Sequence, residues 1–393
     1  MTGLFKFTLS LACLTIFMQA SAQQVYQDCH NPDILRPDQP TTLTRQEIIL
    51  PGIMGYNVYK ADLHMHSTYS DGMGTPSLRA LEAWLDGLDV FAIADHLEYR
   101  KFEEHMIGHL TGYVKEGAEA INQFIYIEPA DERGIQVDLN YSVKRCMEEG
   151  QKLDLTVIPG IEITRDDMTI GHYAALFTTD NNSIYNPDPA IALRNAKSQG
   201  AIIQHNHPGR KKPDMNQPEW ERMVYEEGLI SGIEVMNGEE FYPKAVERAK
   251  NYGLYVAANT DLHRTTAIDY HRSGFRRNMT LIFAKDKTLP SIKEALLAGR
   301  TLAYSFGNIA GQEDMLIEFF TASVSVSEIG DNSIAITNKS SLAYILKLDC
   351  KGNPVWIQPL SSVIISGIKN GKRPTAEVTN MWYGDGKHPV INL

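Results

Sequence analysis

Histidine and carboxylate residues recur in this chain at the ends of short apolar runs. Imidazole nitrogens and carboxylate oxygens are the ligands of borderline divalent metals such as Zn, Mn and Fe. The runs are Asp62-Leu63-His64-Met65-His66 with Asp71 following, Ala94-Asp95-His96, Gly160-Ile161-Glu162, Gly171-His172, His205-Asn206-His207-Pro208 and Asp261-Leu262-His263. The recurrence predicts a hydrolase that holds several metal ions.

A single histidine of this kind is usually an ordinary surface side chain. Seven of the 12 histidines lie in these runs, however, and the remaining ones do not: His30, His105, His109, His271 and His388. The joint pattern therefore favours a shared metal site over a set of unrelated surface residues.

The candidate ligands need a scaffold that brings several strand ends to one place. From Tyr56 onward, helical patterns over 76–85, 189–199 and 243–252 alternate with strand-like runs. These runs are 58–63, 90–94, 155–159, 173–177, 201–204, 232–236 and 254–258. The alternation indicates βα units in an α/β fold with a mainly parallel sheet. Because nearly every strand carries a candidate ligand, a barrel is favoured over an open sheet, and no GxGxxG fingerprint indicates a dinucleotide cofactor.

The pattern changes after about Gly311. Short or alternating apolar runs at 323–326, 333–336, 344–348 and 362–365 are separated by turns rich in Gly, Asn and Asp. These runs predict a small C-terminal all-β domain, sandwich-like, and its single histidine makes it a poor candidate for the chemistry. The expected division is a signal peptide at 1–22, an extended segment at 23–55, the catalytic domain at 56–311 and the β domain at 312–393.

The N-terminus and the overall charge restrict where the protein acts and on what. Lys6, an apolar run over 7–18 and Ala20-Ser21-Ala22 form a typical export signal, which predicts a periplasmic or secreted protein with no later membrane span. A net charge of -11 argues against duplex nucleic acid and favours a small substrate. Cys29, Cys146 and Cys350 show no CxxC spacing, so neither a thiolate metal site nor a disulfide framework is indicated. The oligomeric state is not indicated.

The order of the motifs resembles the polymerase and histidinol phosphatase (PHP) superfamily of metal-dependent phosphoesterases. The resemblance covers about 56–311. The matching motifs are His64-x-His66, Ser70-Asp71-Gly72, Ala94-Asp95-His96, Gly160-x-Glu162, His172, His207-Pro208, Asp261-x-His263 and the segment Ala295-Leu296-Leu297-Ala298-Gly299-Arg300-Thr301. The resemblance implies a distorted seven-stranded (β/α) barrel, similar to a TIM barrel, with two to three divalent metals at the strand C-termini.

The resemblance also implies how the ligands divide. His64, His66, Glu162 and Asp261 would surround a first metal. Glu162 would bridge to a second metal held with His172 and His207, and a third would lie among Asp71, His96 and His263. Mixed imidazole and carboxylate ligands fit Zn, Mn or Fe better than Ca or Mg, and the choice among the three stays open.

Several neighbouring residues have alternative interpretations. Asp95 could orient a ligand imidazole or cap a helix. Glu234 and Asn237 could belong to the site or form a salt bridge or cap. His205 could contact the substrate, donate a proton or support a ligand, and Arg210 could bind phosphate or lie in a solvated loop with Lys211 and Lys212.

The predicted reaction is hydrolysis of a phosphate ester by a hydroxide that bridges two metals, with Glu162, Asp261 and His205 as catalytic residues and with Arg210 and His205 contacting the substrate. Phosphomonoesters and phosphodiesters, including small or cyclic nucleotides, are candidate substrates. Alternatives are a histidinol-phosphatase-like monoesterase, which export disfavours, and a non-catalytic metal-binding module, which the complete set of ligands disfavours. A carbohydrate or peptide hydrolase has no separate signature here.

Overall fold

The computed structural model describes residues 26–28, 31–37, 44–100, 125–126, 137–165, 167, 169–368 and 373–393. The expected signal peptide at 1–22, together with Cys29, His30, His105 and His109, lies outside these residues. The chain divides into two compact units, Met1–Thr44 and Arg45–Leu393. In the first unit, β1 (Tyr26–Asp28) pairs antiparallel with β2 (Leu35–Pro37). No helix in the described part of the chain is long and apolar enough to cross a membrane.

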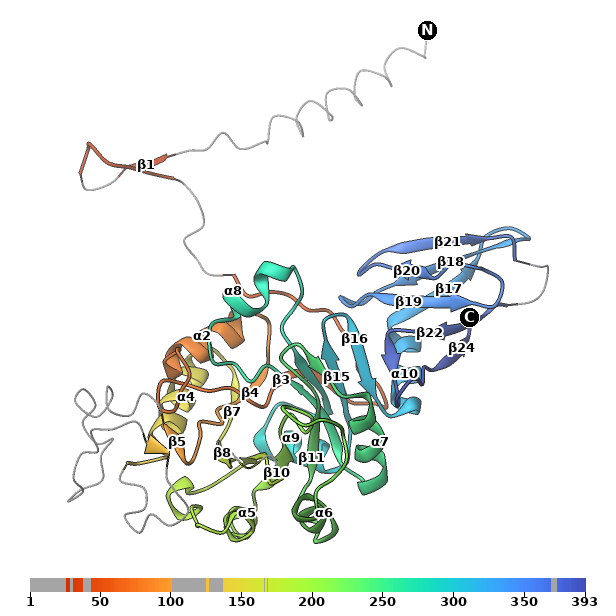
Figure 1. Cartoon of the computed structure of the whole chain (residues 1–393). Helices are drawn as coiled ribbons and strands as arrows, with labels where there is room; N and C mark the ends of the chain where they lie inside the picture. The colour runs from red at the N-terminus through yellow and green to blue at the C-terminus, as the bar shows by residue number, and fades with distance from the viewer. Residues whose placement is uncertain are drawn as a thin grey trace. The chain divides into compact units, whose positions relative to one another are not determined.

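The second unit contains a seven-stranded sheet that carries the first ligand motifs (Figure 1). Its strand order is β23 (Met381–Trp382), β16 (Asn308–Gly311), β15 (Thr301–Ser305), β14 (Met279–Ala284), β3 (Asn57–Asp62), β4 (Val90–Ala92) and β7 (Thr156–Ile158). The strands β3, β4 and β7 run parallel, whereas β14 and β15 run antiparallel to their neighbours. Strand β14 is buried along its whole length.

A second sheet carries the remaining motifs. Its order is β12 (Glu240–Phe241), β11 (Gly232–Asn237), β10 (Ile202–His205), β9 (His172–Leu176) and β8 (Gly160–Thr164), and β13 (Tyr255–Asn259) also pairs with β11. The pairs β10–β11 and β11–β13 are parallel, and the pairs β8–β9 and β9–β10 are antiparallel.

The prediction of a mainly parallel sheet is therefore wrong, since both sheets are mixed. Strand β8 ends at Thr164 and β9 begins at His172, and β15 and β16 are still closer in sequence. Connections of this length are too short for a parallel crossover, so these pairs form antiparallel hairpins. Two isolated parallel bridges, Met65 with Leu262 and His96 with Glu162, link the two sheets. A continuous closed ladder of seven strands is not present among the described residues, and the closed barrel stays a prediction.

The helices cover these sheets and begin and end where local sequence signals place them. They are α2 (Pro76–Leu85), α4 (Tyr141–Lys152), α5 (Pro189–Ser198), α6 (Glu219–Glu226), α7 (Pro243–Tyr252), α8 (Thr266–Asp269) and α9 (Leu289–Leu297), with short 3-10 turns η1 (Asn181–Ser183) and η2 (His271–Ser273). The Thr75 side chain accepts a hydrogen bond from the Leu78 amide at the start of α2, and Gly253 with φ 66 ends α7. Helix α2 packs on α4, and α5 and α7 pack on β10 and β11 (Figure 1). A short hairpin of β5 (Tyr99–Arg100) and β6 (Ile125–Tyr126) follows β4.

The region after Gly311 begins with a helix that the sequence patterns do not predict, α10 (Glu313–Ser323). Two sheets follow, consisting of β17 (Val324–Glu328), β18 (Ser333–Asn338) and β21 (Ser362–Ser366) in one and β20 (Val355–Ile357), β19 (Tyr344–Leu348), β22 (Thr375–Val378) and β24 (Val390–Asn392) in the other. Burial alternates along β18, as in a sheet that packs on one face. Strand β23 from this region pairs with β16 in the seven-stranded sheet, so the two regions share a sheet. The domain boundary at 311 therefore stays a prediction. Cys146 and Cys350 are free.

Candidate metal centre

All nine predicted metal ligands gather at one place in the second unit. The structure contains three groups of potential ligand atoms, and within each group these atoms lie within 4.8 Å of one another. The groups are His64, His66 and Glu162; Glu162, His172 and His207; and His66, Asp71, His96 and His263. Asp261 lies against the first group, since its Oδ1 is 3.0 Å from His66 Nε2 and 3.3 Å from His64 Nε2. His66 thus lies in two of the groups.

Each ligand is positioned by the strand next to it. His64 and His66 follow β3, His96 follows β4, and Asp261 follows β13. His172 is instead the first residue of β9, because that strand runs antiparallel to β8 and presents its N-terminal end to the site. The mixed strand directions therefore still converge on one mouth.

Glu162 is the centre of the arrangement. It is fully buried on β8, and its Oε2 lies 2.6 Å from His96 Nδ1 while its Oε1 lies 3.2 Å from His64 Nε2. Burial alone would raise the pKa of this carboxyl, but the neighbouring imidazoles of His96 and His64 hold the pKa well below its usual range. Glu162 therefore remains an anion with each oxygen facing a different histidine.

The histidines have divergent proton affinities. Burial, together with repulsion from His263 and His96, lowers the pKa of His66 to about 3. Burial would also lower the pKa of His96, but Glu162 and Asp71 raise it to about 10. Buried imidazoles that share carboxylates in this way form an environment suited to cations.

Several buried ligand atoms lack a hydrogen bond, although each lies within 4.0 Å of an atom of the opposite kind, carboxylate oxygen or imidazole nitrogen. His66 Nδ1, Asp71 Oδ1 and His172 Nδ1 make no hydrogen bond within the described residues. Buried polar atoms almost always have a partner, because an unsatisfied one is costly. Three such atoms in one cluster of imidazoles and carboxylates fit a site for divalent metals.

Glu234, whose role the sequence left open, supports the ligands from behind. This fully buried carboxylate accepts hydrogen bonds from His64 Nδ1 at 2.9 Å and from the His207 amide at 2.7 Å. The side-chain amides of Asn237 and Asn259 donate to it as well, at 2.7 and 2.9 Å. An acceptor on Nδ1 of His64 directs the lone pair of Nε2 toward the site.

Asp95 takes neither of the two roles considered for it. It accepts hydrogen bonds from the Ser67 amide at 2.6 Å, from the Ser67 hydroxyl at 2.8 Å and from the Ser70 hydroxyl at 2.9 Å. These bonds fix the turn after His66, and that turn presents Asp71 to the third group. Asp95 therefore stabilises the turn.

Arg79 also supports the site, and the sequence analysis missed it. The side chain extends from α2 and is fully buried. Its Nε donates to the His66 carbonyl at 2.7 Å, and its NH2 donates to the His263 carbonyl at 3.0 Å. An arginine in a helix gives no sequence signal for this contact, because both acceptors are backbone groups.

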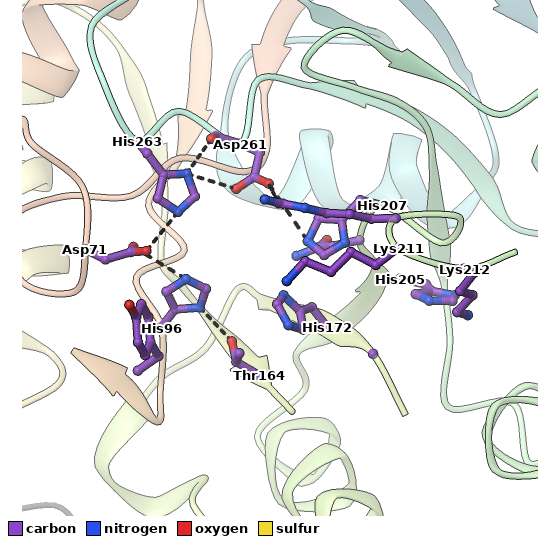
Figure 2. Close-up of a pocket in the computed structure, with 14 residues that line it drawn as sticks. Asp71, His96, Thr164, His172, His205, His207, Lys211, Lys212, Asp261 and His263 are labelled. Carbon is purple, nitrogen blue, oxygen red and sulfur yellow. Dashed lines mark hydrogen bonds and ion pairs between the residues drawn. The ribbon is translucent and has the colours of Figure 1, made fainter. Parts of the chain in front are cut away.

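A cavity of about 350 Å³ opens over the ligands (Figure 2). His205 lines it but belongs to none of the three ligand groups among the described residues. Its Nδ1 lies 2.7 Å from the Tyr225 hydroxyl, and its ring stacks on Tyr173. Burial and the charge of Lys212 keep the pKa of His205 well below its usual range.

Arg210 also lines the cavity, and its NH1 lies 3.0 Å from Asp261 Oδ2. A second hollow of about 360 Å³ shares Arg210, Asp261 and His263 with the first. The metal ligands therefore lie beneath two adjoining spaces, and the ion pair of Arg210 with Asp261 belongs to both.

Comparison with solved structures finds a two-domain protein from Bacteroides vulgatus that contains a predicted PHP-like metal-dependent phosphoesterase. It is 30% identical to this chain with a TM-score of 0.76, and the match covers 90% of this chain and 99% of that one. A second match is a putative metal-dependent phosphoesterase from Bifidobacterium adolescentis, with 15% identity and a TM-score of 0.35 over 52% of this chain and 87% of that one. A third is a lesion-specific endonuclease from Pyrococcus furiosus, with 16% identity and a TM-score of 0.36 over 65% of this chain and 59% of that one.

No known family model and no curated protein matches the chain. The weaker structural matches carry no argument here. The likeness to the Bacteroides vulgatus protein, at 30% identity, extends over 90% of this chain, and the clustered ligands follow the motif order expected from the sequence. This chain therefore belongs to the PHP family of metal-dependent phosphoesterases.

Proposed function

We propose that this protein hydrolyses a small phosphate ester with two to three divalent metals, Zn, Mn or Fe, held by the nine clustered residues. The observation that carries the proposal is the position of Glu162. One buried carboxylate lies in two ligand groups and also contacts His96 of the third. Bound metals would supply Lewis-acid charge for the phosphoryl oxygens and a nucleophile from water near neutral pH.

The residues of the chain would divide the remaining work. Glu162 and Asp261 place anionic oxygens between the ligand groups, where they would help to hold bound metals. Arg210 lies at the rim, where its guanidinium can reach a phosphoryl group next to Asp261. His205 lines the same cavity, and we propose that it contacts the substrate; its lowered pKa keeps the imidazole neutral, which disfavours its alternative role as proton donor to the leaving group.

The size and charge of the site support a small substrate. A cavity of about 350 Å³ accommodates a phosphoryl group and part of a small molecule, and the adjoining hollow of about 360 Å³ can take the alcohol portion. The net charge of -11 does not favour duplex nucleic acid. We further propose that seven strands drawn from the two sheets enclose the site as the distorted barrel and that the protein is exported through its N-terminal segment.

The test combines metal analysis with a substrate panel. Protein purified without chelator is expected to contain two to three equivalents of divalent metal and to hydrolyse at least one phosphomonoester, phosphodiester or cyclic nucleotide. Protein with full metal content that hydrolyses none of them would be the non-catalytic module considered above, and the proposal would fail. Sequencing of the mature N-terminus checks the export signal.

A further inference from the structure

The cavity over the ligands is lined by three consecutive cations that differ in their surroundings. Arg210 pairs with Asp261 at 3.0 Å, and Lys212 Nζ lies 2.5 Å from Glu221 Oε2. For the Lys211 ammonium, neither an ion pair nor a hydrogen bond is found within the described residues, although it lines the same cavity. Lys211 is thus the one cation of the three without a partner in the described part of the chain.

The backbone holds Lys211 in an unusual conformation. Its φ is 58°, in the left-handed region that non-glycine residues rarely adopt. A tight turn surrounds it, with the Arg210 amide bonded to the His207 carbonyl and the Lys212 amide bonded to the Gly209 carbonyl. Such conformations persist where the surroundings over-determine them, and they cluster at functional sites.

The residues on either side, Arg210 and Lys212, hold the Lys211 backbone in this conformation through their own contacts. Lys212 is largely buried, and its partner Glu221 is fully buried and also lies 2.5 Å from Arg248 NH1. Arg210 is tied to Asp261 on the opposite side. Figure 2 shows the Lys211 side chain extending into the cavity over the metal ligands, whereas Lys212 lies beside His205.

We propose that Lys211 binds the phosphoryl group of the substrate beside Arg210 and that Lys212 anchors the loop. This assignment rests on the proposed function, because it takes the ligand to be a phosphate ester. An ammonium group is a strong, flexible point donor for phosphate oxygens. Of the three cations, Lys211 alone has no ion-pair partner in the described structure, whereas Arg210 keeps N–H donors beyond the NH1 that contacts Asp261.

Binding of inorganic phosphate to the metal-loaded protein tests the proposal without relying on catalysis. In Lys211→Gly the amine is removed and the left-handed backbone is kept without penalty. We expect calorimetry to show phosphate affinity about 10- to 100-fold weaker, the loss of one charge-assisted hydrogen bond, with metal content unchanged and thermal stability unchanged or higher. Lys211→Arg should retain part of the affinity.

Matched variants separate a specific role from general effects. Lys244→Ala removes an exposed lysine on α7 that lines none of the described cavities, and phosphate affinity should stay at the wild-type value. Lys212→Ala should lower the melting temperature, because Glu221 would lose a buried partner. Wild-type phosphate affinity in Lys211→Gly, loss of metal from that variant, or a wild-type protein that does not bind phosphate would each overturn the proposal.

Hydrolysis assays distinguish this inference from the proposed function. If the protein hydrolyses phosphate esters, Lys211→Gly should raise KM about 10- to 100-fold and change kcat much less. An active protein whose KM does not respond would overturn the role of Lys211 and leave the function standing. Phosphate binding that depends on Lys211 in a protein that hydrolyses no ester would leave the inference standing and remove the function.

Discussion

Glu162 is the residue on which the site depends most, because one carboxylate serves several ligand groups. In Glu162→Gln the side chain keeps its shape but loses its charge, and one oxygen becomes a donor that faces imidazoles. We expect the variant to lose at least one equivalent of metal. Elemental analysis after gel filtration measures the loss, and Glu226→Gln, at an exposed position on α6, is the control. Full metal content in Glu162→Gln would contradict the bridging role.

Protons should compete with metals for the same residues. In the metal-free protein, burial lowers the pKa of His96, but Glu162 and Asp71 outweigh burial and raise this pKa to about 10. The pKa of His64 is also raised, because Asp261 and Glu234 outweigh the effect of burial. Metal binding at pH 7 to 8 should therefore release protons, and affinity should increase with pH. Calorimetry in buffers with different ionisation enthalpies measures the release, and uptake independent of buffer would contradict it.

The same pKa shifts predict how the stability of metal-free protein depends on pH. A histidine whose folded pKa is raised stabilises the fold fully below its unfolded value near 6.5. For His96 that contribution is lost as pH rises through about 10. Chelator-treated protein should therefore melt at progressively lower temperature as the pH rises from 7 to 10, whereas metal-loaded protein should not follow this trend.

Glu234 supports two of the candidate ligands, His64 and His207, through hydrogen bonds. Glu234→Gln replaces an acceptor of hydrogen bonds from His64 and the His207 amide with a group that can face them through its NH2. Replacement of such a supporting partner typically costs about 10- to 100-fold in metal affinity, and we expect that loss here. Competition with a chromogenic chelator measures the affinity, and circular dichroism checks that the variant is folded. Unchanged affinity would make Glu234 a purely structural residue.

At the level of elements, helix α2 supports the site from outside the sheets. Arg79→Met removes the donors to the His66 and His263 carbonyls, and it leaves Glu82 without its buried ion pair. We expect a loss of about 3 kcal/mol in the free energy of unfolding together with weaker metal binding. Thr75→Ala in the same helix should cost about 1 kcal/mol through its cap and leave metal content unchanged. Denaturant titration and metal analysis of both variants separate the two effects.

Elements with strong local signals could be predicted from the sequence, and the rest could not. Helices α2 and α7 begin at a proline and end where expected, since caps and Gly253 mark them locally. Each candidate ligand lies in a short motif close to a strand, so the residues that cluster could also be predicted, and their role as metal ligands stays a prediction. The support from Glu234 joins residues 170 positions apart, and no local pattern indicates that pairing. The parallel sheet was wrong because β8, β14, β15 and β16 were not recognised as strands, and because β9–β10 and β14–β15 pair antiparallel although a helix lies in each connection.

At the level of the whole molecule, the C-terminal region shares one hydrophobic core with the strands that carry the ligands. That core includes Met65 and Phe91 on one side and Tyr344, Val378 and Leu393 on the other. The region also contributes β23 to the seven-stranded sheet and exchanges hydrogen bonds between Ser341 and Ile49. It carries no ligand cluster among the described residues, but it does not pack as a separate body.

Truncation after Gly311 is therefore expected to destabilise the catalytic region. Removal of residues 312–393 would expose a continuous apolar surface and leave β16 without its partner β23. We expect aggregation or a much lower melting temperature, measured by light scattering and calorimetry against the full chain. A soluble truncated protein with unchanged melting temperature and full metal content would show that the two regions are independent.

The two bridges that link the sheets have a consequence for how this protein can diverge. His96 and Glu162, which form one bridge, are both candidate ligands, and the other bridge joins Met65, between His64 and His66, to Leu262, between Asp261 and His263. The same few peptide groups thus join the two halves of the fold and place its chemistry. The bridges are backbone contacts, so they fix the positions of these residues whatever side chains they carry, whereas the cavity rim around Arg210 and Lys211 contributes nothing to them. Changes in substrate are therefore expected to come from substitutions in the loops of the cavity rim, while the backbone at the two bridges is retained.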